Sequence, residues 1–578
     1  MAVVTPTADR PSSPAADAAR RLAARAKLAA PALAELTQEQ IDRLVDAAAA
    51  AVRPHAEDLA ALAVEETGFG VVADKVQKNR FASDRVHAFI RPMKTVGVIH
   101  RDDERKVVEI AEPFGVVAAI VPSTNPTSTA IYKILIALKA RCPIVLSPHP
   151  SAARCITETA RIMADAAAAA GAPEGAVSWM EAVSLDGTQA LMTHRDVAVI
   201  LATGGMGLVR AAYSAGKPAY GVGPGNAPCF VERTADVAKA ASDIMTGKTF
   251  DNGLLCSSPN SVVVENAVAD ELRRALVAEG AYFLSPAEAN ALTSVLITPQ
   301  RLPNPALVGR PATVLAERAG IRVPSSTRVL IAELGGVGRD YPLSIEKLCP
   351  VLSYYVVADW REGCERCKQI LRYGGMGHTM SIHSRDERII LEFGLKKPAF
   401  RIVVNTPTTH GSIGLTTGLD PAMTLGCGGY GGNITSDNIS PRHLLNIKRL
   451  AYELRPAPRA GSAAPPVPQL ASTPVAAPMP LPKVASLPVT HEIGAAAIRQ
   501  ELASYLAGRG RSAPAAATPS RDAAASAAVA EFVCEEDVRH AIAHGRTILV
   551  GERTIITPSA RDLGEARRVF VLDGWPRR

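Results

Sequence analysis

The stretch Glu112–Pro150, EPFGVVAAIVPSTNPTSTAIYKILIALKARCPIVLSPHP, contains two short apolar segments on either side of a segment with helical character. The apolar segments VVAAIV and PIVLS are rich in β-branched residues, which is typical of buried strands. Two strands joined through a helix pair in parallel, because such a connection crosses over the face of the sheet. The stretch therefore predicts a βαβ unit.

The same alternation continues along the chain to about residue 455. Short apolar segments recur between helical ones, namely AVILATG, CFVE, SVVVE, SVLIT, RVLIAE and RIVVN. This pattern predicts an α/β protein with parallel sheets and crossover helices. A chain of 578 residues is too long for a single core, so we expect two or three folded units.

Composition excludes several classes of function. Hydrophobic residues make up 47% of the chain and aromatic residues 4%, which indicates a globular core built of Ala, Val, Leu and Ile. The net charge of +7 is small for this length, and basic blocks with interleaved aromatics are absent, so we expect no nucleic-acid partner. Neither a secretory leader nor a membrane-spanning run is visible, so we expect a soluble cytoplasmic protein with no membrane partner.

The nine cysteines are odd in number and lack the spacing of a disulfide framework, so we expect reduced thiols. Cys364 and Cys367 form a CxxC pair. A zinc or redox role would need a second ligand pair or a redox fold, and neither is visible in the sequence. We therefore expect two helix residues here and no metal site.

Asn125 and a glycine-rich turn are candidates for binding at strand ends. The amide of Asn125 could donate to an oxygen that develops negative charge, a contact worth roughly 3 kcal/mol; the alternative is a helix N-cap. The stretch Thr203–Pro228, TGGMGLVRAAYSAGKPAYGVGPGNAP, places glycines between an apolar strand and a helix that begins near Leu208. Glycines at a helix N-terminus let a pyrophosphate approach the free N–H groups. The alternative is a loop that only reverses the chain direction and binds no ligand.

Cys256 lies in the stretch Lys248–Glu265, KTFDNGLLCSSPNSVVVE, between an Asn-Gly turn and a β-branched run. Free cysteines are often small buried core residues. A thiol held in a turn beside a strand is also a candidate nucleophile. These residues alone leave both interpretations open.

Taken in order, EPFGVVAAIVPSTNP, TGG, GVGPGNAP, FDNGLLCSSPNSVVVE, EKLCPVLSYY, NTP and TLGCGGYGGN resemble the aldehyde dehydrogenase superfamily over about residues 35–455. The likeness is greatest to the CoA-acylating enzymes, which include the N-terminal half of bifunctional aldehyde/alcohol dehydrogenases and enzymes of bacterial microcompartments. The resemblance implies an α/β aldehyde dehydrogenase fold with a Rossmann-like NAD-binding domain, a catalytic α/β domain and a small oligomerisation element. A disordered C-terminal tail with short helices is expected to follow.

The resemblance also implies roles for single residues. Cys256 would attack the aldehyde carbonyl, and after hydride transfer to NAD it would carry a thioester. Asn125 and the Cys256 backbone N–H would form the oxyanion hole, and Glu346 would bind the nicotinamide ribose. The other cofactor-binding positions are Ser123, Thr124, Ser147, Pro148, His149, Thr203, Gly204, Gly205, Gly221, Val222, Gly223 and Pro350. The substrate or CoA candidates are His378, Thr409 and Cys427. Ordinary packing is an equal alternative for His378 and Cys427, and Thr409 is a weaker candidate for the pocket.

This sequence differs from the hydrolytic members of the family at two positions, and both differences bear on the reaction. Those relatives have a lysine where this chain has Ser147, Pro148 and His149, and its absence is typical of the acylating group. They also have a glutamate that activates water at about the position of Gly221. Without a base, water is a poor nucleophile, whereas a CoA thiol can take the acyl group. The resemblance therefore predicts that CoA is the co-substrate.

We expect the following organisation. Residues 1–30 are a disordered segment, 31–230 are mainly the NAD-binding domain, 231–430 are mainly the catalytic domain, and 431–455 return to the core or oligomerisation element. Residues 456–490 are a Pro/Ala linker, 491–510 an amphipathic helix, 511–530 a second linker and 531–578 a small segment with a helix, a hairpin across Val550–Glu552 and a second short helix.

The tail leads to expectations about partners. The helix over 491–510 is too short to be stable alone and resembles the encapsulation peptides that recruit enzymes into microcompartments, although an unrelated interaction helix is an alternative. The expected partners are a short-chain aldehyde, other copies of the chain in a dimer or tetramer, and shell proteins of a microcompartment lumen. The alternative functions are a degenerate dehydrogenase acting as a scaffold or shell adaptor, and an acylating sulfoacetaldehyde dehydrogenase.

Overall fold

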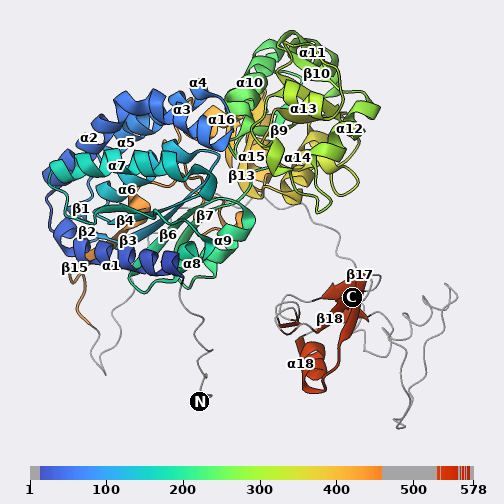
Figure 1. The fold of residues 1–578 in the computed structure, drawn as a ribbon. Helices are drawn as coiled ribbons and strands as arrows, with labels where there is room; N and C mark the ends of the chain where they lie inside the picture. Colours follow the sequence, from blue (N-terminus) through green and yellow to red (C-terminus); the bar gives the residue numbers. More distant parts are fainter. Residues whose placement is uncertain are drawn as a thin grey trace. The chain divides into compact units, whose positions relative to one another are not determined.

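The computed structural model describes residues 13–457, 530–533, 535–556, 560, 563–564, 567 and 569–572. The chain divides into one unit that ends at Pro458 and a second that begins at Arg459, and each is described by itself. The first unit contains two parallel sheets with helices on their faces and a small antiparallel sheet (Figure 1).

The first parallel sheet has five strands in the order β5-β4-β3-β6-β7. Their bounds are β3 Val116–Val121, β4 Ile144–Pro148, β5 Val177–Trp179, β6 Val197–Thr203 and β7 Ala219–Val222. The predicted βαβ unit is confirmed: β3 leads through α6 (Pro126–Lys139) to β4, and the two strands pair in parallel from Val117 opposite Ile144 to Val121 opposite Pro148.

Both faces of this sheet are covered, which explains why its strands read as continuous apolar runs. Along β3, Val117, Ala119 and Val121 pack towards one core, whereas Val116 and Ala118 pack towards the other. The first core includes helices α2 (Gln38–Val52), α3 (Ala56–Thr67), α6 and α7 (Ala153–Ala169). The second includes α1 (Pro14–Ala34), α8 (Leu185–Thr193) and α9 (Met206–Tyr213).

The N-terminal segment differs from the expectation of disorder over residues 1–30. Helix α1 begins at Pro14, and the hydroxyl of Ser13 accepts a hydrogen bond from the backbone N–H of Ala16 at 3.3 Å. Ala19, Ala23 and Ala26 are fully buried against the first sheet. The prediction was wrong from residue 13 onwards. The buried face of this helix is formed by alanines, and it lacks the large apolar residues that usually indicate a buried helix in a sequence. Residues 1–12 lie outside the described residues.

The second parallel sheet has seven strands in the order β10-β11-β12-β9-β8-β13-β14. Their bounds are β8 Ala227–Val231, β9 Pro259–Glu265, β10 Ala281–Phe283, β11 Val329–Glu333, β12 Val351–Val357, β13 Gly377–His383 and β14 Ala399–Val404. The chain changes sheets between Val222 and Ala227, a few residues before the domain boundary expected at 230.

Helices flank the strands of the second sheet (Figure 1). They are α10 Val237–Thr249, α11 Asn266–Ala278, α12 Pro286–Leu296, α13 Ala312–Arg318, α14 Trp360–Tyr373, α15 Glu387–Lys396 and α16 Thr408–Ser412. Cys364 and Cys367 lie on α14 and are buried, as expected for helix residues. All the cysteines in the described residues are free thiols.

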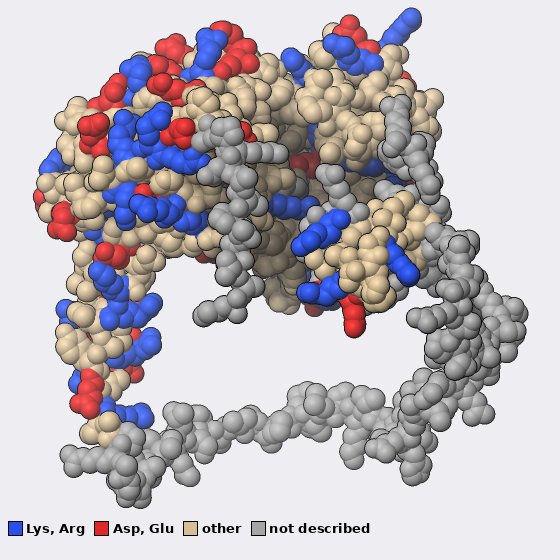
Figure 2. All heavy atoms as spheres, turned by 60° about the horizontal axis from the view of Figure 1, so that its bottom comes forward, with Lys and Arg blue, Asp and Glu red and all other residues tan. Residues whose placement is uncertain are grey.

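The antiparallel sheet has the order β1-β2-β15, with β1 Gly97–Asp102, β2 Val107–Pro113 and β15 Leu445–Ala451. Strand β15 brings the chain back to the first half of the unit, where it pairs with the whole of β2. Between α3 and β1 the chain forms α4 (Val72–Arg80), a π-helical turn η2 (Phe81–Val86) and α5 (His87–Ile90). On the face shown in Figure 2, acidic and basic side chains are intermingled.

The second unit contains a three-stranded parallel sheet in the order β16-β17-β18 and a helix. Its elements are β16 Ala530–Val533, α18 Glu535–Ala543, β17 Ile548–Ile556 and β18 Phe570–Leu572. The hairpin predicted across Val550–Glu552 was wrong, because the two apolar runs that suggested it form one strand that pairs in parallel with both neighbours. Residues 458–529, including the helix predicted over 491–510 and most of both linkers, lie outside the described residues. Within the described ranges, no helix has the length and apolar character needed to cross a bilayer.

Candidate active site

A cavity of about 580 Å³ opens at the carboxyl ends of β3, β4 and β6. Strand β3 has β4 on one side and β6 on the other, so this is the point where the strand order reverses and where open α/β sheets bind ligands. The predicted residues that line the cavity are Ser123, Thr124, Asn125, Ser147, Pro148, His149, Thr203, Gly204, Gly205, Val222, Gly223, Cys256 and Glu346.

Cys256 follows a tight turn whose backbone is left-handed at three consecutive residues. The φ angles are 49° at Asp251, 52° at Asn252 and 74° at Gly253. Asp, Asn and Gly are the residues that tolerate this region, and strained backbone of this kind concentrates at functional sites. The FDNG sequence before the cysteine therefore shapes the turn that places the thiol in the cavity wall.

The Cys256 thiol is only partly exposed and lies among groups that oppose its ionisation. Burial raises its pKa to about 12, and the carboxylate of Glu346 and the thiol of Cys427 act in the same direction. The guanidinium of Arg401 is the cation that lowers it. Arg401 is itself buried, and its Nε has no partner among the described residues. Because the pKa stays at about 12 with Arg401 in place, the free thiol needs further positive charge, such as that of a bound nicotinamide ring, in order to ionise.

We expect alkylation of Cys256 by iodoacetamide to accelerate with pH without reaching a plateau below pH 9. Because the raised pKa of about 12 lies above this range, the thiolate fraction should grow about tenfold for each pH unit. The rate of modification of Cys256 is measured by mass spectrometry between about pH 6 and about pH 9. Over this range the thiolate fraction should increase about a thousandfold. A rate that levels off near pH 7 would show that the thiol is already ionised.

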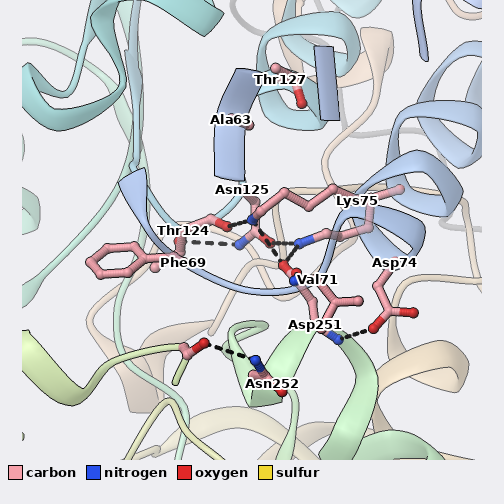
Figure 3. Close-up of polar contacts among 12 residues, drawn as sticks. Ala63, Phe69, Val71, Asp74, Lys75, Thr124, Asn125, Thr127, Asp251 and Asn252 are labelled. Atoms are coloured by element: carbon pink, nitrogen blue, oxygen red, sulfur yellow. Dashed lines mark hydrogen bonds and ion pairs between the residues drawn. The ribbon is translucent and has the colours of Figure 1, made fainter. Parts of the chain in front are cut away.

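Asn125 occupies the N-cap position of α6, but its side chain makes no capping hydrogen bond. Its Oδ1 instead accepts a hydrogen bond from the Lys78 ammonium at 2.6 Å, and its Nδ2 donates to Thr124 Oγ1 at 3.2 Å. Figure 3 shows this amide beside Lys75 and Asp251. The capping alternative therefore does not account for the side chain, and the amide lines the same cavity as Cys256.

Glu346 lies in the wall between the cavity and the turn before β8. Its Oε1 accepts a hydrogen bond from the Gly225 backbone N–H at 2.8 Å. Burial raises its pKa to about 8, opposed by that hydrogen bond and by the charges of Lys248 and Lys347. Of the described residues that line the cavity, Glu346 alone carries a carboxylate. With its pKa above neutrality, the Glu346 side chain is largely protonated at pH 7.

Gly221 does not face the cavity. A Cβ at this position would lie 2.8 Å from Val209 Cγ1 and 3.0 Å from the Tyr213 hydroxyl, so any side chain would run into α9. Val222, the next residue, lines the cavity instead. Successive residues of a strand point to opposite faces, so residue 222 faces the cavity and residue 221 does not. Because the side chain of Val222 is apolar, this position of the cavity wall has no base.

Four further predicted residues do not line the cavity. The ring of His378 is fully buried beside Gly225, its Nδ1 lies 2.9 Å from Thr379 Oγ1, and burial lowers its pKa to about 3. Thr409 donates a hydrogen bond to the Gly247 carbonyl at 2.7 Å and so ties α16 to α10. Cys427 and Pro350 are also buried, and neither lines the cavity.

The cavity fits a dinucleotide. Helix α9 follows β6 directly, its N-cap is Gly205, and no side chain caps it, so its first N–H groups are free to receive a pyrophosphate. A Cβ on Gly205 would meet nothing within 4 Å, which leaves open space at this helix end. Leu185 and Leu208 supply apolar wall, and the Ser147 hydroxyl lies 2.8 Å from that of Thr188.

Several residues of the site have no recognisable sequence signal. Leu185 and Thr188 on α8, Leu254 and Leu348 line the cavity from three separate segments. The cluster of Lys75, Lys78 and Asp251 behind Asn125 joins helix α4 to the turn before Cys256, across more than 170 residues of sequence. Only the FDNG motif, which contains Asp251 and precedes the cysteine, could have drawn attention to it.

Comparison with known proteins agrees with this architecture. The model of the aldehyde dehydrogenase family matches residues 4–286. The bifunctional aldehyde-alcohol dehydrogenase AdhE of Escherichia coli is 43% identical over 435 residues, which cover 74% of this chain and 49% of the relative. The chain thus spans about half the length of that relative. An acetylating aldehyde dehydrogenase from Geobacillus thermoglucosidasius has 49% identity and a TM-score of 0.76, with 77% of this chain and 98% of that one covered.

Two propionaldehyde dehydrogenases are also similar. One, from Rhodopseudomonas palustris, was solved with bound CoA and an acylated cysteine; it has 29% identity and a TM-score of 0.67, with 76% of this chain and 97% of that one covered. The other comes from the fucose utilisation bacterial microcompartment of Clostridium phytofermentans and has 30% identity and a TM-score of 0.67, with 75% of this chain and 97% of that one covered. The chain belongs to the aldehyde dehydrogenase family, in its acylating branch.

Proposed function

We propose that this protein oxidises a short-chain aldehyde with NAD and transfers the acyl group to CoA. The observation that carries the proposal is the meeting of Cys256, Asn125 and Glu346 in one cavity at the reversal point of a dinucleotide-binding sheet. The acetylating and CoA-bound relatives support the same reaction class.

Cys256, Asn125 and Glu346 have different roles in the proposed reaction. The Cys256 thiolate adds to the aldehyde carbon, and the Asn125 Nδ2 and the Cys256 backbone N–H donate to the oxygen that becomes negative. Nicotinamide, when bound, supplies the hydride acceptor. Glu346, placed beside Cys256 in the wall, would hold the ribose of that group. Once the aldehyde carbon is oxidised, Cys256 carries the acyl group as a thioester.

Release of the acyl group is proposed to need CoA. The wall position next to Gly221 is the apolar Val222, which cannot deprotonate water. Glu346 accepts a hydrogen bond from the Gly225 N–H and is assigned to the nicotinamide ribose. A thiol needs no such help, because it ionises more readily than water and is intrinsically nucleophilic. The thioester is therefore stable until a CoA thiol enters and exchanges with Cys256.

The test is NADH formation by the purified full-length protein with NAD and propionaldehyde, with and without CoA. We expect the steady-state rate to fall at least about 100-fold when CoA is omitted, the usual contribution of a general base that is missing here. A rate that does not depend on CoA would overturn the acylating mechanism. Absence of NADH formation across a series of short aldehydes, including sulfoacetaldehyde, would favour the degenerate scaffold.

We also propose that the segment after residue 455 directs the enzyme into a bacterial microcompartment, as a lumen enzyme. The support is the resemblance of residues 491–510 to encapsulation peptides and the similarity to a microcompartment propionaldehyde dehydrogenase. Residues from Arg459 onward form a unit of their own, so removal of the segment after residue 455 takes only the last three residues of the first unit.

Deletion of residues 456–578 is expected to leave the aldehyde-oxidising rate within about twofold of the full chain, because every residue that lines the cavity belongs to the first unit. The same deletion should abolish co-purification with shell proteins from cells that make both. Loss of activity with retained co-purification would contradict a targeting role.

A further inference from the structure

The amide of Asn125 is held from behind by a buried group of charges, which we call the Asp251 cluster and which comprises Lys75, Lys78 and Asp251. Lys75 and Lys78 lie one turn apart on α4, so their side chains share one face of the helix. Both ammonium groups contact Asp251 Oδ2, Lys75 at 3.0 Å and Lys78 more closely. All three side chains are at most 2% exposed.

Within the Asp251 cluster, only Lys78 touches the oxyanion-hole residue. Its Nζ donates to Asn125 Oδ1 at 2.6 Å, while Lys75 donates to the Thr124 carbonyl at 3.1 Å (Figure 3 shows Lys75, Thr124 and Asn125). An ammonium carries donors and no acceptor, so the atom facing Lys78 must be the amide oxygen. The contact therefore fixes which way round the Asn125 amide lies and leaves Nδ2 as the end available to a ligand.

Lys78 also affects the strength of the donor. A hydrogen bond from a cation withdraws electron density from the amide oxygen, and this polarisation passes to the Nδ2–H groups. Burial excludes water from the contact, which makes the polarisation larger than it would be at the surface. An oxyanion on the cavity side would thus meet a pre-oriented and strengthened donor.

We propose that Lys78, held by Asp251, is a positioning residue that orients and polarises the Asn125 amide for the oxyanion formed when Cys256 adds to a carbonyl. The inference rests on the proposed function, since it assigns a role within the same site. Lys78 does not line the cavity, and its contact with the site is the hydrogen bond to Asn125, so it acts through that residue.

Asp251 links the two halves of the oxyanion hole. Its Oδ1 accepts from the Val71 backbone N–H at 2.7 Å, and its own backbone N–H donates to Asp74 Oδ2 at 2.7 Å. The same residue begins the left-handed turn that leads to Cys256. The two catalytic elements, the Asn125 amide and the Cys256 backbone, are therefore fixed relative to each other through one carboxylate.

Packing alone gives a poor account of the Asp251 cluster. Two buried lysines facing one shared carboxylate are costly, and apolar residues of similar volume are often equally or more stable in such a place. Burial lowers the pKa of Lys78 to about 8, so the charged form is disfavoured relative to a lysine in water. The role of Lys78 in holding the Asn125 amide explains why a charged side chain, and not an apolar one, occupies this buried position.

The test is a double-mutant cycle on the full chain, with Lys78→Met, Asn125→Ala and both together. The readout is the burst of p-nitrophenolate from p-nitrophenyl acetate, in which Cys256 is acylated through the same oxyanion without NAD, CoA or an aldehyde. We expect Lys78→Met to slow acylation about 30-fold, the order of one charged hydrogen bond, and to have little further effect when Asn125 is already alanine. Independent, multiplying effects of the two substitutions would overturn the proposal.

Three controls separate positioning from a general effect on the fold. Lys75→Met removes a buried lysine from the same helix and the same carboxylate but leaves Asn125 Oδ1 bound, so it should slow acylation several-fold less than Lys78→Met. Alkylation of Cys256 by iodoacetamide passes through no oxyanion and should be unchanged in Lys78→Met; an equal loss in both reactions would contradict the proposal. If Lys78→Met does not fold, Lys78→Gln places a neutral polar group of similar length beside Asp251, leaves the Lys75–Asp251 ion pair intact and is expected to show the same selective loss to a smaller extent.

The cycle also distinguishes this proposal from the proposed function. If the protein oxidises no aldehyde yet the burst depends on Lys78 through Asn125, the acylating function fails and the positioning role stands. If aldehyde oxidation requires CoA but Lys78→Met acylates at the wild-type rate, the positioning role fails alone.

Discussion

Replacement of Cys256 by serine is expected to reduce NADH formation at least about 10⁴-fold, the scale seen when a covalent nucleophile is removed. A serine hydroxyl in the same turn is far harder to ionise than the thiol, whose pKa is already raised to about 12. An alkoxy acyl intermediate would also exchange poorly with a CoA thiol. The measurement is NADH formation under saturating aldehyde, NAD and CoA, together with the mass of the protein after incubation with aldehyde and NAD.

A matched control is Cys364→Ser. Cys364 is also buried, lies on α14 and accepts a hydrogen bond from Lys397 at 2.6 Å, which a serine hydroxyl can accept in its place. This variant should keep most of its activity. Comparable loss in the two variants would indicate damage to the fold, and retained activity in Cys256→Ser would remove the thiol from the mechanism.

Replacement of Asn125 by alanine is expected to lower kcat about 10²–10³-fold, the usual cost of removing one oxyanion-hole donor. The donor acts on an oxygen that is negative only during the reaction, so the KM for NAD should change little. The measurement is kcat and KM for NAD and aldehyde with CoA held saturating. A loss confined to KM would place Asn125 in ground-state binding and contradict its assignment to the oxyanion hole.

Sequence and structure agree best where local pattern determines the outcome. The β-branched runs around Glu112–Pro150 predicted the parallel pair β3 and β4, and the Asn-Gly turn predicted the tight bend before Cys256. Both depend on residues close together in the chain. The family motifs then added Asn125 and Glu346, which no local pattern distinguishes from a helix cap and a surface carboxylate.

The predictions were incomplete where the result depends on the direction of a side chain or on contacts between residues far apart in the sequence. Which of Gly221 and Val222 faces the cavity depends on the phase of β7, and the motif alone does not give that phase. The contact of Lys78 with Asn125 joins residues 47 positions apart, and its contact with Asp251 joins residues 173 positions apart. Such contacts exist only after the two sheets and helix α4 have come together.

The central claim is that Cys256 holds an acyl group that CoA, and not water, removes. The most direct measurement is the intact mass of the protein after mixing with propionaldehyde and NAD, first without CoA and then after CoA is added. The account predicts a propionyl adduct on Cys256 that persists without CoA and is discharged as propionyl-CoA within the mixing time once CoA is present. An adduct that decays to free propionate without CoA, or the absence of any adduct on Cys256, would contradict it.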